Sequence, residues 1–283
     1  MEEQQLDWQL SLAECLAVGD TDSNDKVGFW QTAIGLQAVK EIAVSDFLLE
    51  TARAHIGGTL DIDGVQKRLQ EYYSGNTEFA ADFATREADV TSARIVQVLS
   101  EDAPGISPLE WQTIHRRLFA GVFDCAGQIR DTDASRDEWI LQGETANYAS
   151  SQSVRRLLSY DFEMEKQFSY AGRSAAATNR HIAKFAADIW QIHPFDEGNT
   201  RSLAVMLIRY LRGLGFQIHL NAFAKHSVFF RNALVRANYV DLPNGIQATT
   251  KYLEQFFDMF LFSADHALNN SELRVAYNAD EKI

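Results

Sequence analysis

Two apolar helical stripes joined by a nine-residue loop most constrain how this chain can fold. Residues 181–192 and 203–214 carry apolar side chains at intervals of three and four, the spacing of a buried helix face. The loop between them reads His193-Pro194-Phe195-Asp196-Glu197-Gly198-Asn199-Thr200-Arg201. Pro194 disfavours helix at the residue before it, so the first helix should end there. Gly198 permits a tight turn and Asn199 is a favourable N-cap, so we predict a second helix from about Asn199.

The loop combines groups that suit chemistry on a phosphate. A helix start presents unpaired amides and the positive end of the helix dipole, which bind anions. Here these amides belong to Gly198, Asn199, Thr200 and Arg201. The Arg201 guanidinium can grip phosphate oxygens, and the Glu197 carboxylate can hold a Mg²⁺ that bridges two phosphates. His193 titrates near neutral pH and can accept a hydroxyl proton. Taken singly, each residue also has an ordinary structural interpretation, as a turn or a helix cap.

The same string resembles the signature of the Fic family, H-x-F-x-[D/E]-G-N-G-R-x-x-R. The matching positions are His193, Phe195, Glu197, Gly198, Asn199 and Arg201. The resemblance implies that His193 is the base that activates a target hydroxyl and that Glu197 binds Mg²⁺. It also implies phosphate binding by residues 198–201, including Thr200. Family members typically transfer AMP from ATP to a Ser, Thr or Tyr hydroxyl of another protein and release pyrophosphate.

Two positions depart from that signature. Thr200 replaces its second glycine, and Ala204 stands where its second arginine, the partner of the terminal phosphate, is expected. Arg209 and Arg212 lie about 12 and about 16 Å further along the helix than Arg201, too far to substitute directly. Two alternatives therefore stay open. One is a nucleotide-binding regulatory or interaction protein on a degenerate Fic scaffold. The other is a Fic enzyme that removes AMP or uses another donor nucleotide.

The resemblance extends over residues 107–262. Ser107-Pro108-Leu109-Glu110 forms a capping box with proline at the first helical position. The polar, turn-rich residues 131–137 and the apolar residues that follow predict the chain's one short β-hairpin. In Fic proteins the equivalent flap overlies the active site and can pair with a target segment. Trp139 and Ile140 are candidates to grip that segment, with a core position as the alternative. The predicted fold is mainly α, with this hairpin as its flap.

The N-terminal third indicates a small helical module over residues 28–75. A helical or polar segment, residues 1–27, precedes it, and a connecting helix and linker, residues 76–106, follow. The module resembles, more weakly, the helical antitoxin of Fic toxin–antitoxin pairs, whose inhibitory motif is [S/T]-x-x-x-E-[G/N]. The best candidate for that motif has Lys40 where its Glu is expected and Glu41 one place later. We take both as regulatory candidates, with a plain surface lysine as the alternative for Lys40; whether the module inhibits stays open. Residues 263–283 are a polar tail or final helix.

Composition narrows the functional classes. The net charge of −13 argues against general nucleic-acid binding. We expect no membrane association, because no apolar run reaches the roughly 18 residues of a membrane helix, and the acidic N-terminus is unlike a signal peptide. The only two cysteines, Cys15 and Cys125, form no metal or redox pattern. We expect a cytoplasmic enzyme that uses ATP and Mg²⁺, with a protein bearing an acceptor hydroxyl as partner. Modification of the chain itself and assembly into a homodimer stay open.

Overall fold

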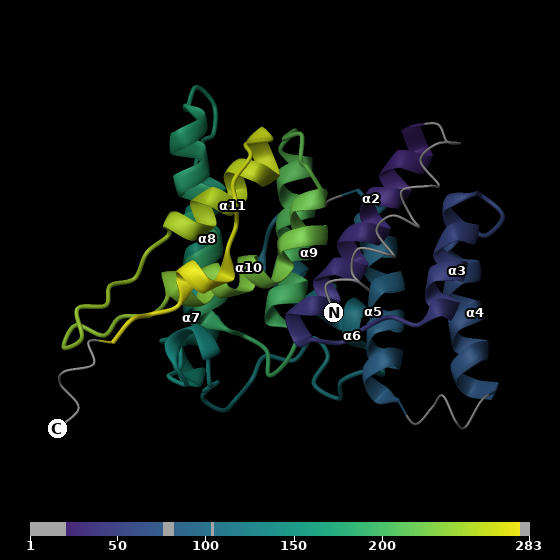
Figure 1. Ribbon diagram of the computed structural model, residues 1–283, viewed down its shortest axis with the longest axis horizontal. Coiled ribbons are helices and arrows are strands. Elements are labelled where there is room, and N and C mark those ends of the chain that lie inside the picture. Colours follow the sequence, from purple (N-terminus) through teal and green to yellow (C-terminus); the bar gives the residue numbers. More distant parts are fainter. Residues whose placement is uncertain (1–20, 76–81, 103–104, 278–283) are drawn as a thin grey trace.

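The computed structural model describes residues 21–75, 82–102 and 105–277, and it is built almost entirely of helices (Figure 1). Within these ranges no β-strand forms, and the only bridge-type pairing joins Asp241 to Ile246. The mainly α fold class predicted from the sequence is therefore confirmed. None of the described helices is both long and apolar enough to cross a membrane.

Residues 21–75 and 82–102 form four α-helices and one 3-10 helix. These are α2 (Thr21–Gly35), η2 (Leu36–Lys40), α3 (Asp46–Ile56), α4 (Ile62–Gly75) and α5 (Phe83–Leu99). Helix α2 starts before the predicted module boundary at residue 28. Residues 1–20 of the predicted N-terminal segment, and residues 76–81 and 103–104 of the predicted linker, lie outside the described residues.

Residues 105–277 form six longer helices and three short 3-10 turns. The helices are α6 (Pro108–Phe119), α7 (Val154–Gln167), α8 (Ala175–Ile192), α9 (Asn199–Gly213), α10 (Asn221–Ala237) and α11 (Lys251–Phe262). The turns are η4 (Trp139–Leu141), η5 (Ser151–Ser153) and η6 (Asn270–Leu273). Helix α6 starts as its capping box predicts, because the Ser107 hydroxyl accepts the Glu110 amide and Pro108 opens the first turn. Of the predicted C-terminal tail, residues 263–277 contain η6, and residues 278–283 lie outside the described residues.

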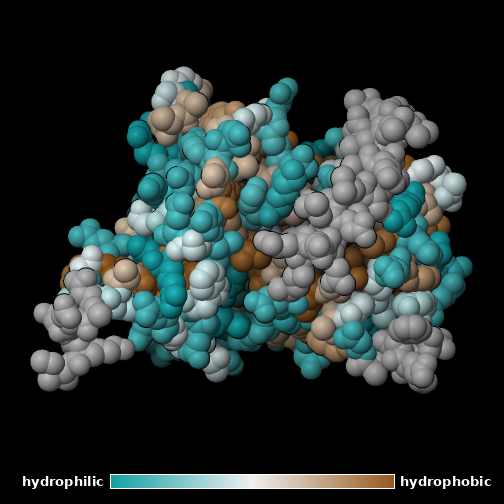
Figure 2. Space-filling view, in the orientation of Figure 1, coloured by the Kyte–Doolittle hydropathy of each residue, from teal (hydrophilic) through white to brown (hydrophobic). Residues whose placement is uncertain are grey.

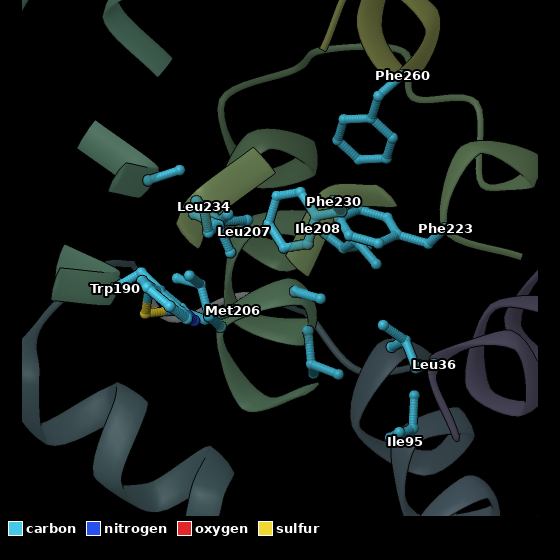
Figure 3. Packing of buried hydrophobic residues seen from close by; sticks show 14 of the residues in the cluster. Leu36, Ile95, Trp190, Met206, Leu207, Ile208, Phe223, Phe230, Leu234 and Phe260 are labelled. Carbon is cyan, nitrogen blue, oxygen red and sulfur yellow. The ribbon is translucent and has the colours of Figure 1, made fainter. Parts of the chain in front are cut away.

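Helix α9 lies near the middle of the view in Figure 1, with α8 and α11 on one side and α2 and α5 on the other. It packs on α5, α6 and α8, and α10 packs on α2 and α11. Every α9 residue from Asn199 to Leu211 is buried. Leu36 of η2 and Ile95 of α5 lie in the same hydrophobic core as Ile208, Phe223 and Phe230 (Figure 3). The N-terminal helices therefore share one core with the later ones. The face seen in Figure 2 is largely hydrophilic, with hydrophobic residues visible mainly between helices.

The predicted β-hairpin at residues 131–141 is wrong. Residues 131–138 have no regular structure, and 139–141 form the 3-10 turn η4. In a β-hairpin the backbone groups of these residues would bond to the opposite strand, but here they bond to side chains. The Arg136 amide donates to the Thr145 hydroxyl, and the Arg130 guanidinium donates to the Thr132 and Ala149 carbonyls. Only around Glu138 and Glu144 do the two arms pair through their backbones. We keep the name flap for residues 131–145.

The close approach of α2 to α10 gives a test of this packing. A Cβ atom added to Gly35 would lie 2.5 Å from the Ala224 carbonyl oxygen and 2.6 Å from its Cα, both backbone atoms that cannot swing aside. We expect Gly35→Ala to lower the free energy of unfolding by about 1–3 kcal/mol through overpacking. Urea denaturation measures this. Gly57→Ala is the matched control, since Gly57 has a φ of −73° and meets only its own helix carbonyls. Equal stability of both variants would contradict the packing.

Candidate active site

The loop between α8 and α9 begins with His193, which ends α8 in the left-handed conformation, with φ 48° and ψ 61°. The buried guanidinium of Arg130 fixes this unusual backbone, because its Nε donates to the His193 carbonyl at 2.6 Å. The Arg130 amide also donates to the Pro194 carbonyl at 2.9 Å. The helix therefore ends where Pro194 predicts, and a residue distant in sequence holds the turn.

Phe195 and Asn199 lock the middle of the loop. The Asn199 amide group accepts from the Phe195 N–H at 3.0 Å and donates to the Phe195 carbonyl at 2.6 Å. The Phe195 ring is buried and stacks on the His115 ring with centroids 3.8 Å apart. Phe195 thus anchors the loop in the core. Asn199 bonds back across the loop with its side chain, so what it can offer an anion is its backbone amide.

Gly198, rather than Asn199, is the N-cap of α9. Its φ of 78° is left-handed, and an added Cβ would lie 2.7 Å from Cζ of Phe119, so only glycine fits. A glycine cap has no side chain to accept the first amides of α9, and none does so. No side chain therefore competes with an anion for these amides.

Thr200, which replaces the second glycine of the signature, has a packing role. Its hydroxyl accepts the indole N–H of Trp190 at 2.9 Å, and both side chains are buried. The threonine thus satisfies a buried donor of α8 while its own backbone amide stays in the first turn of α9. An unpaired indole N–H at that depth would be costly.

A cavity of about 120 Å³ opens at this loop. It brings together His193 and residues 197–201, and it adds residues from η2, the flap, α8 and α10: Val39, Lys40, Arg136, Trp190 and Arg231. A larger cavity of about 750 Å³ adjoins it and shares Val39, Lys40 and Arg231. Sequence reasoning singled out neither Arg136 nor Arg231 as a site residue.

Arg201 is tied to the N-terminal helices. One terminal nitrogen donates to the Gln37 side-chain oxygen at 2.9 Å, and the other to a Glu87 carboxylate oxygen at 2.7 Å. The second Glu87 oxygen accepts from the Lys40 ammonium at 2.9 Å. Gln37 and Glu87 carry no sequence signal that would link them to this site, since they lie 164 and 114 residues from Arg201.

Burial controls the protonation of His193. Burial is the main cause that lowers the pKa of the imidazole to about 3, and the positive charges of Arg136 and Arg130 contribute to the same shift. The imidazole is therefore neutral at pH 7. Its Nδ1 atom is buried and has no hydrogen-bond partner among the described residues. A neutral imidazole has a lone pair to accept a proton.

His115, beneath the loop, is held in one neutral tautomer. Its Nδ1 accepts the Gly127 amide at 2.8 Å, so Nε2 carries the proton and donates to the Glu197 carbonyl at 2.8 Å. Burial lowers the pKa of His115 to about 4. This ring therefore supports the loop from the core, between the backbone of Glu197 and the ring of Phe195.

Glu197 is the candidate metal ligand. Its side chain is 42 % exposed, and a terminal nitrogen of Arg136 lies 3.3 Å from one carboxylate oxygen. No cluster of three or more His, Cys, Asp or Glu side chains suited to a metal occurs in the part of the chain that the structure describes. A Mg²⁺ at Glu197 would therefore need further oxygen ligands from a bound nucleotide or from water.

The other candidate residues separate clearly. Trp139 is 52 % exposed and lines the larger cavity, as does Glu41 at the end of η2. Ile140 is fully buried, and its carbonyl accepts the Val275 amide, so its side chain is not placed to contact a target. Ala204 is also fully buried, so the position of the missing arginine faces the core.

The family model of the Fic/DOC family matches residues 106–211, which form a Fic/DOC domain. The chain is 27 % identical over 118 residues to the probable protein adenylyltransferase Fic of Escherichia coli (strain K12). The aligned region covers 41 % of this chain and 55 % of that protein. It is 28 % identical over 109 residues to the probable protein adenylyltransferase y4lH of Sinorhizobium fredii (strain NBRC 101917 / NGR234), covering 38 % and 54 %. The chain thus spans about half the length of these relatives.

Solved structures show the same fold. A Fic domain-containing signaling protein from Bacteroides thetaiotaomicron superposes with a TM-score of 0.54 at 15 % identity and covers 90 % of both chains. The N-terminal Fic domain of a Bartonella effector protein superposes with a TM-score of 0.52 at 17 % identity, over 65 % of this chain and 83 % of that one. The first match extends well beyond residues 106–211, so the shared fold includes much of the N-terminal part.

The lowered pKa of His193 predicts a pH dependence of stability. Between about pH 3 and the ordinary value of 6.5 the unfolded chain binds a proton that the folded protein does not. This contribution to stability is complete above pH 6.5 and is lost as the pH falls below it. Between pH 7.5 and pH 5 we expect the free energy of unfolding to fall by roughly 2 kcal/mol more for wild type than for His193→Gln.

Urea denaturation of wild type and His193→Gln at pH 7.5 and pH 5 measures this difference. Other titrating groups, His115 among them, are common to both proteins and cancel in the comparison. Equal losses of stability in the two proteins would show that the His193 imidazole is already protonated at pH 5 in the folded protein, which contradicts the lowered pKa.

Proposed function

We propose that this protein transfers AMP from Mg·ATP to a Ser, Thr or Tyr hydroxyl of a target protein. The observation that carries the proposal is that a base and an anion-binding helix start line the same cavity. The neutral, buried imidazole of His193 lies at one side, and the uncapped amides of α9 lie at the other. The name protein adenylyltransferase, given to the relatives above, supports this choice of reaction.

In the proposed reaction the target hydroxyl attacks the α-phosphorus of ATP. The new O–P bond forms as the bond from the α-phosphorus to the pyrophosphate oxygen breaks, and the hydroxyl proton passes to His193. Phosphates bound in the same cavity bring negative charge beside the imidazole, which raises its pKa and makes it a stronger base. The first amides of α9 stabilise the charge on the phosphate oxygens.

Glu197 would hold Mg²⁺ together with phosphate oxygens. A partly exposed carboxylate at the edge of a phosphate-binding cavity fits the hard, oxygen-preferring ion, which is commonly bound through one or two carboxylates plus substrate phosphates. The metal would neutralise phosphate charge when bound. Arg136, which lies beside the same carboxylate, would then be released toward the phosphates.

The two adjoining cavities fit the two ends of a nucleotide. The smaller one, about 120 Å³, suits phosphate groups but is below the size of typical pockets for whole ligands. The larger one, about 750 Å³, has apolar walls from η2 and α10 and could take a nucleoside. In this proposal the target segment approaches from the flap, where Trp139 is exposed.

One observation favours a second candidate function, a regulatory protein that binds a nucleotide without turnover. Both terminal nitrogens of Arg201 are bound within the protein, and Ala204 adds no charge to α9. Retention of His193 in the cavity favours the enzyme, because nucleotide binding alone does not need a base.

Labelled ATP separates the two functions. We expect wild type, incubated with Mg²⁺ and a bacterial lysate, to attach label from the α-phosphate of ATP to protein, and none from the γ-phosphate. His193→Ala should abolish this labelling while its circular dichroism spectrum and thermal unfolding stay close to wild type. His266→Ala, which changes a histidine outside both cavities, is the matched control. Label from neither position would contradict AMP transfer, and full labelling by His193→Ala would exclude His193 as the base.

A further inference from the structure

Four basic side chains from four separate elements surround the smaller cavity. They are Lys40 of η2, Arg136 of the flap, Arg201 of α9 and Arg231 of α10. The whole chain has a net charge of −13, so this concentration of positive charge is local. Screening limits the effect of distant charges to about 8–10 Å, so nearby cations decide what the cavity attracts.

The carboxylates that pair with these cations lie mostly behind them. Glu87, the partner of Lys40 and Arg201, and Glu138, the partner of Arg231, are each only 1 % exposed. Neither of these two carboxylates lines the smaller cavity, whereas their basic partners do. Glu197, the partner of Arg136, does line the cavity, so an anion there would meet four basic side chains and one carboxylate. Such an arrangement suits polyphosphate more than a neutral ligand.

Arg201 has little left to offer an anion. Gln37 and Glu87 take its two terminal nitrogens, and its side chain is 3 % exposed. One turn further along α9, Ala204 is buried and uncharged. Helix α9 therefore supplies backbone amides but not the side-chain charge that a chain of phosphates needs. That charge has to come from another element.

Lys40 is the best placed of the other cations. Its side chain is 36 % exposed, and its ammonium has three donors, of which Glu87 takes one at 2.9 Å. It lines both cavities, so it lies where they adjoin. Helix η2 packs on α9 and α10, which fixes the base of this side chain against the site.

We infer that Lys40 binds the phosphates of the nucleotide beyond the α-phosphate, with Arg136 and Arg231 beside it. This assignment rests on the proposed use of a nucleotide and adds a positioning and specificity role for a residue outside the Fic/DOC domain. The N-terminal segment then completes the substrate site. Lys40 distinguishes a nucleoside triphosphate from a monophosphate, because only the former reaches it.

Isothermal titration calorimetry with α,β-methylene ATP and with AMP, both with Mg²⁺, tests the assignment on the full chain. The variants are Lys40→Gln, which removes the charge, and Lys40→Arg, which keeps it. Lys184→Gln is the matched control, since Lys184 pairs with Asp188 on the exposed side of α8. Lys40→Gln should bind the triphosphate analogue about tenfold more weakly than wild type, or weaker still, because it lacks a charge-assisted hydrogen bond. AMP binding should not change.

Lys40→Arg should restore most of the affinity, and Lys184→Gln should match wild type. If Lys40→Gln unfolds at a lower temperature than wild type, Lys40→Ala serves as a second charge-removing variant. Equal effects on the analogue and on AMP, or no effect on either, overturn the role of Lys40 while nucleotide use by the wild type stands. A wild type that binds neither nucleotide contradicts the proposed function and this inference with it.

Discussion

The buried ion pair between Arg201 and Glu87 is the contact on which the rest of the site depends. The two side chains are 3 % and 1 % exposed, and without Glu87 the guanidinium of Arg201 would be a buried charge with no carboxylate partner. Breaking such a pair from one side typically costs 3–5 kcal/mol, so α5 and the first turn of α9 are bound together energetically. Gln37 and Lys40 complete the hydrogen bonds of the pair. The N-terminal helices are thus part of the site rather than an addition to it.

The loop is fixed equally firmly from its other side. Arg130 holds the His193 carbonyl, His115 holds the Glu197 carbonyl, and Asn199 closes the turn around Phe195. These contacts lie in the core, so the amides of α9 and the imidazole keep their positions before any ligand arrives. Preorganised donors cost no reorganisation when charge develops, which is the main source of electrostatic catalysis. The same burial that orders His193 also keeps it neutral.

Sequence reasoning succeeded where the physical cause is local. Pro194 and Gly198 set the helix boundaries through their own backbone restrictions, and the capping box set the start of α6. It failed where partners are distant: the antitoxin-like motif pointed to Lys40, but no pattern indicated that Gln37 or Glu87 binds Arg201. The predicted hairpin failed for the same reason, because the guanidinium of Arg130 and the hydroxyl of Thr145 bond to groups that a strand ladder would pair. The sequence pattern made Trp139 and Ile140 equal candidates for the flap contact, but in the structure Trp139 is exposed and Ile140 is buried.

The central claim is that nucleotide phosphates lie between the start of α9 and η2. A crystal structure of the protein with Mg²⁺ and α,β-methylene ATP tests it most directly. We expect phosphate oxygens within hydrogen-bond distance of the amides of residues 198–201 and of the Lys40 ammonium, and we expect His193 beside the α-phosphate. Phosphates bound elsewhere, or η2 displaced from the cavity by the nucleotide, would contradict it.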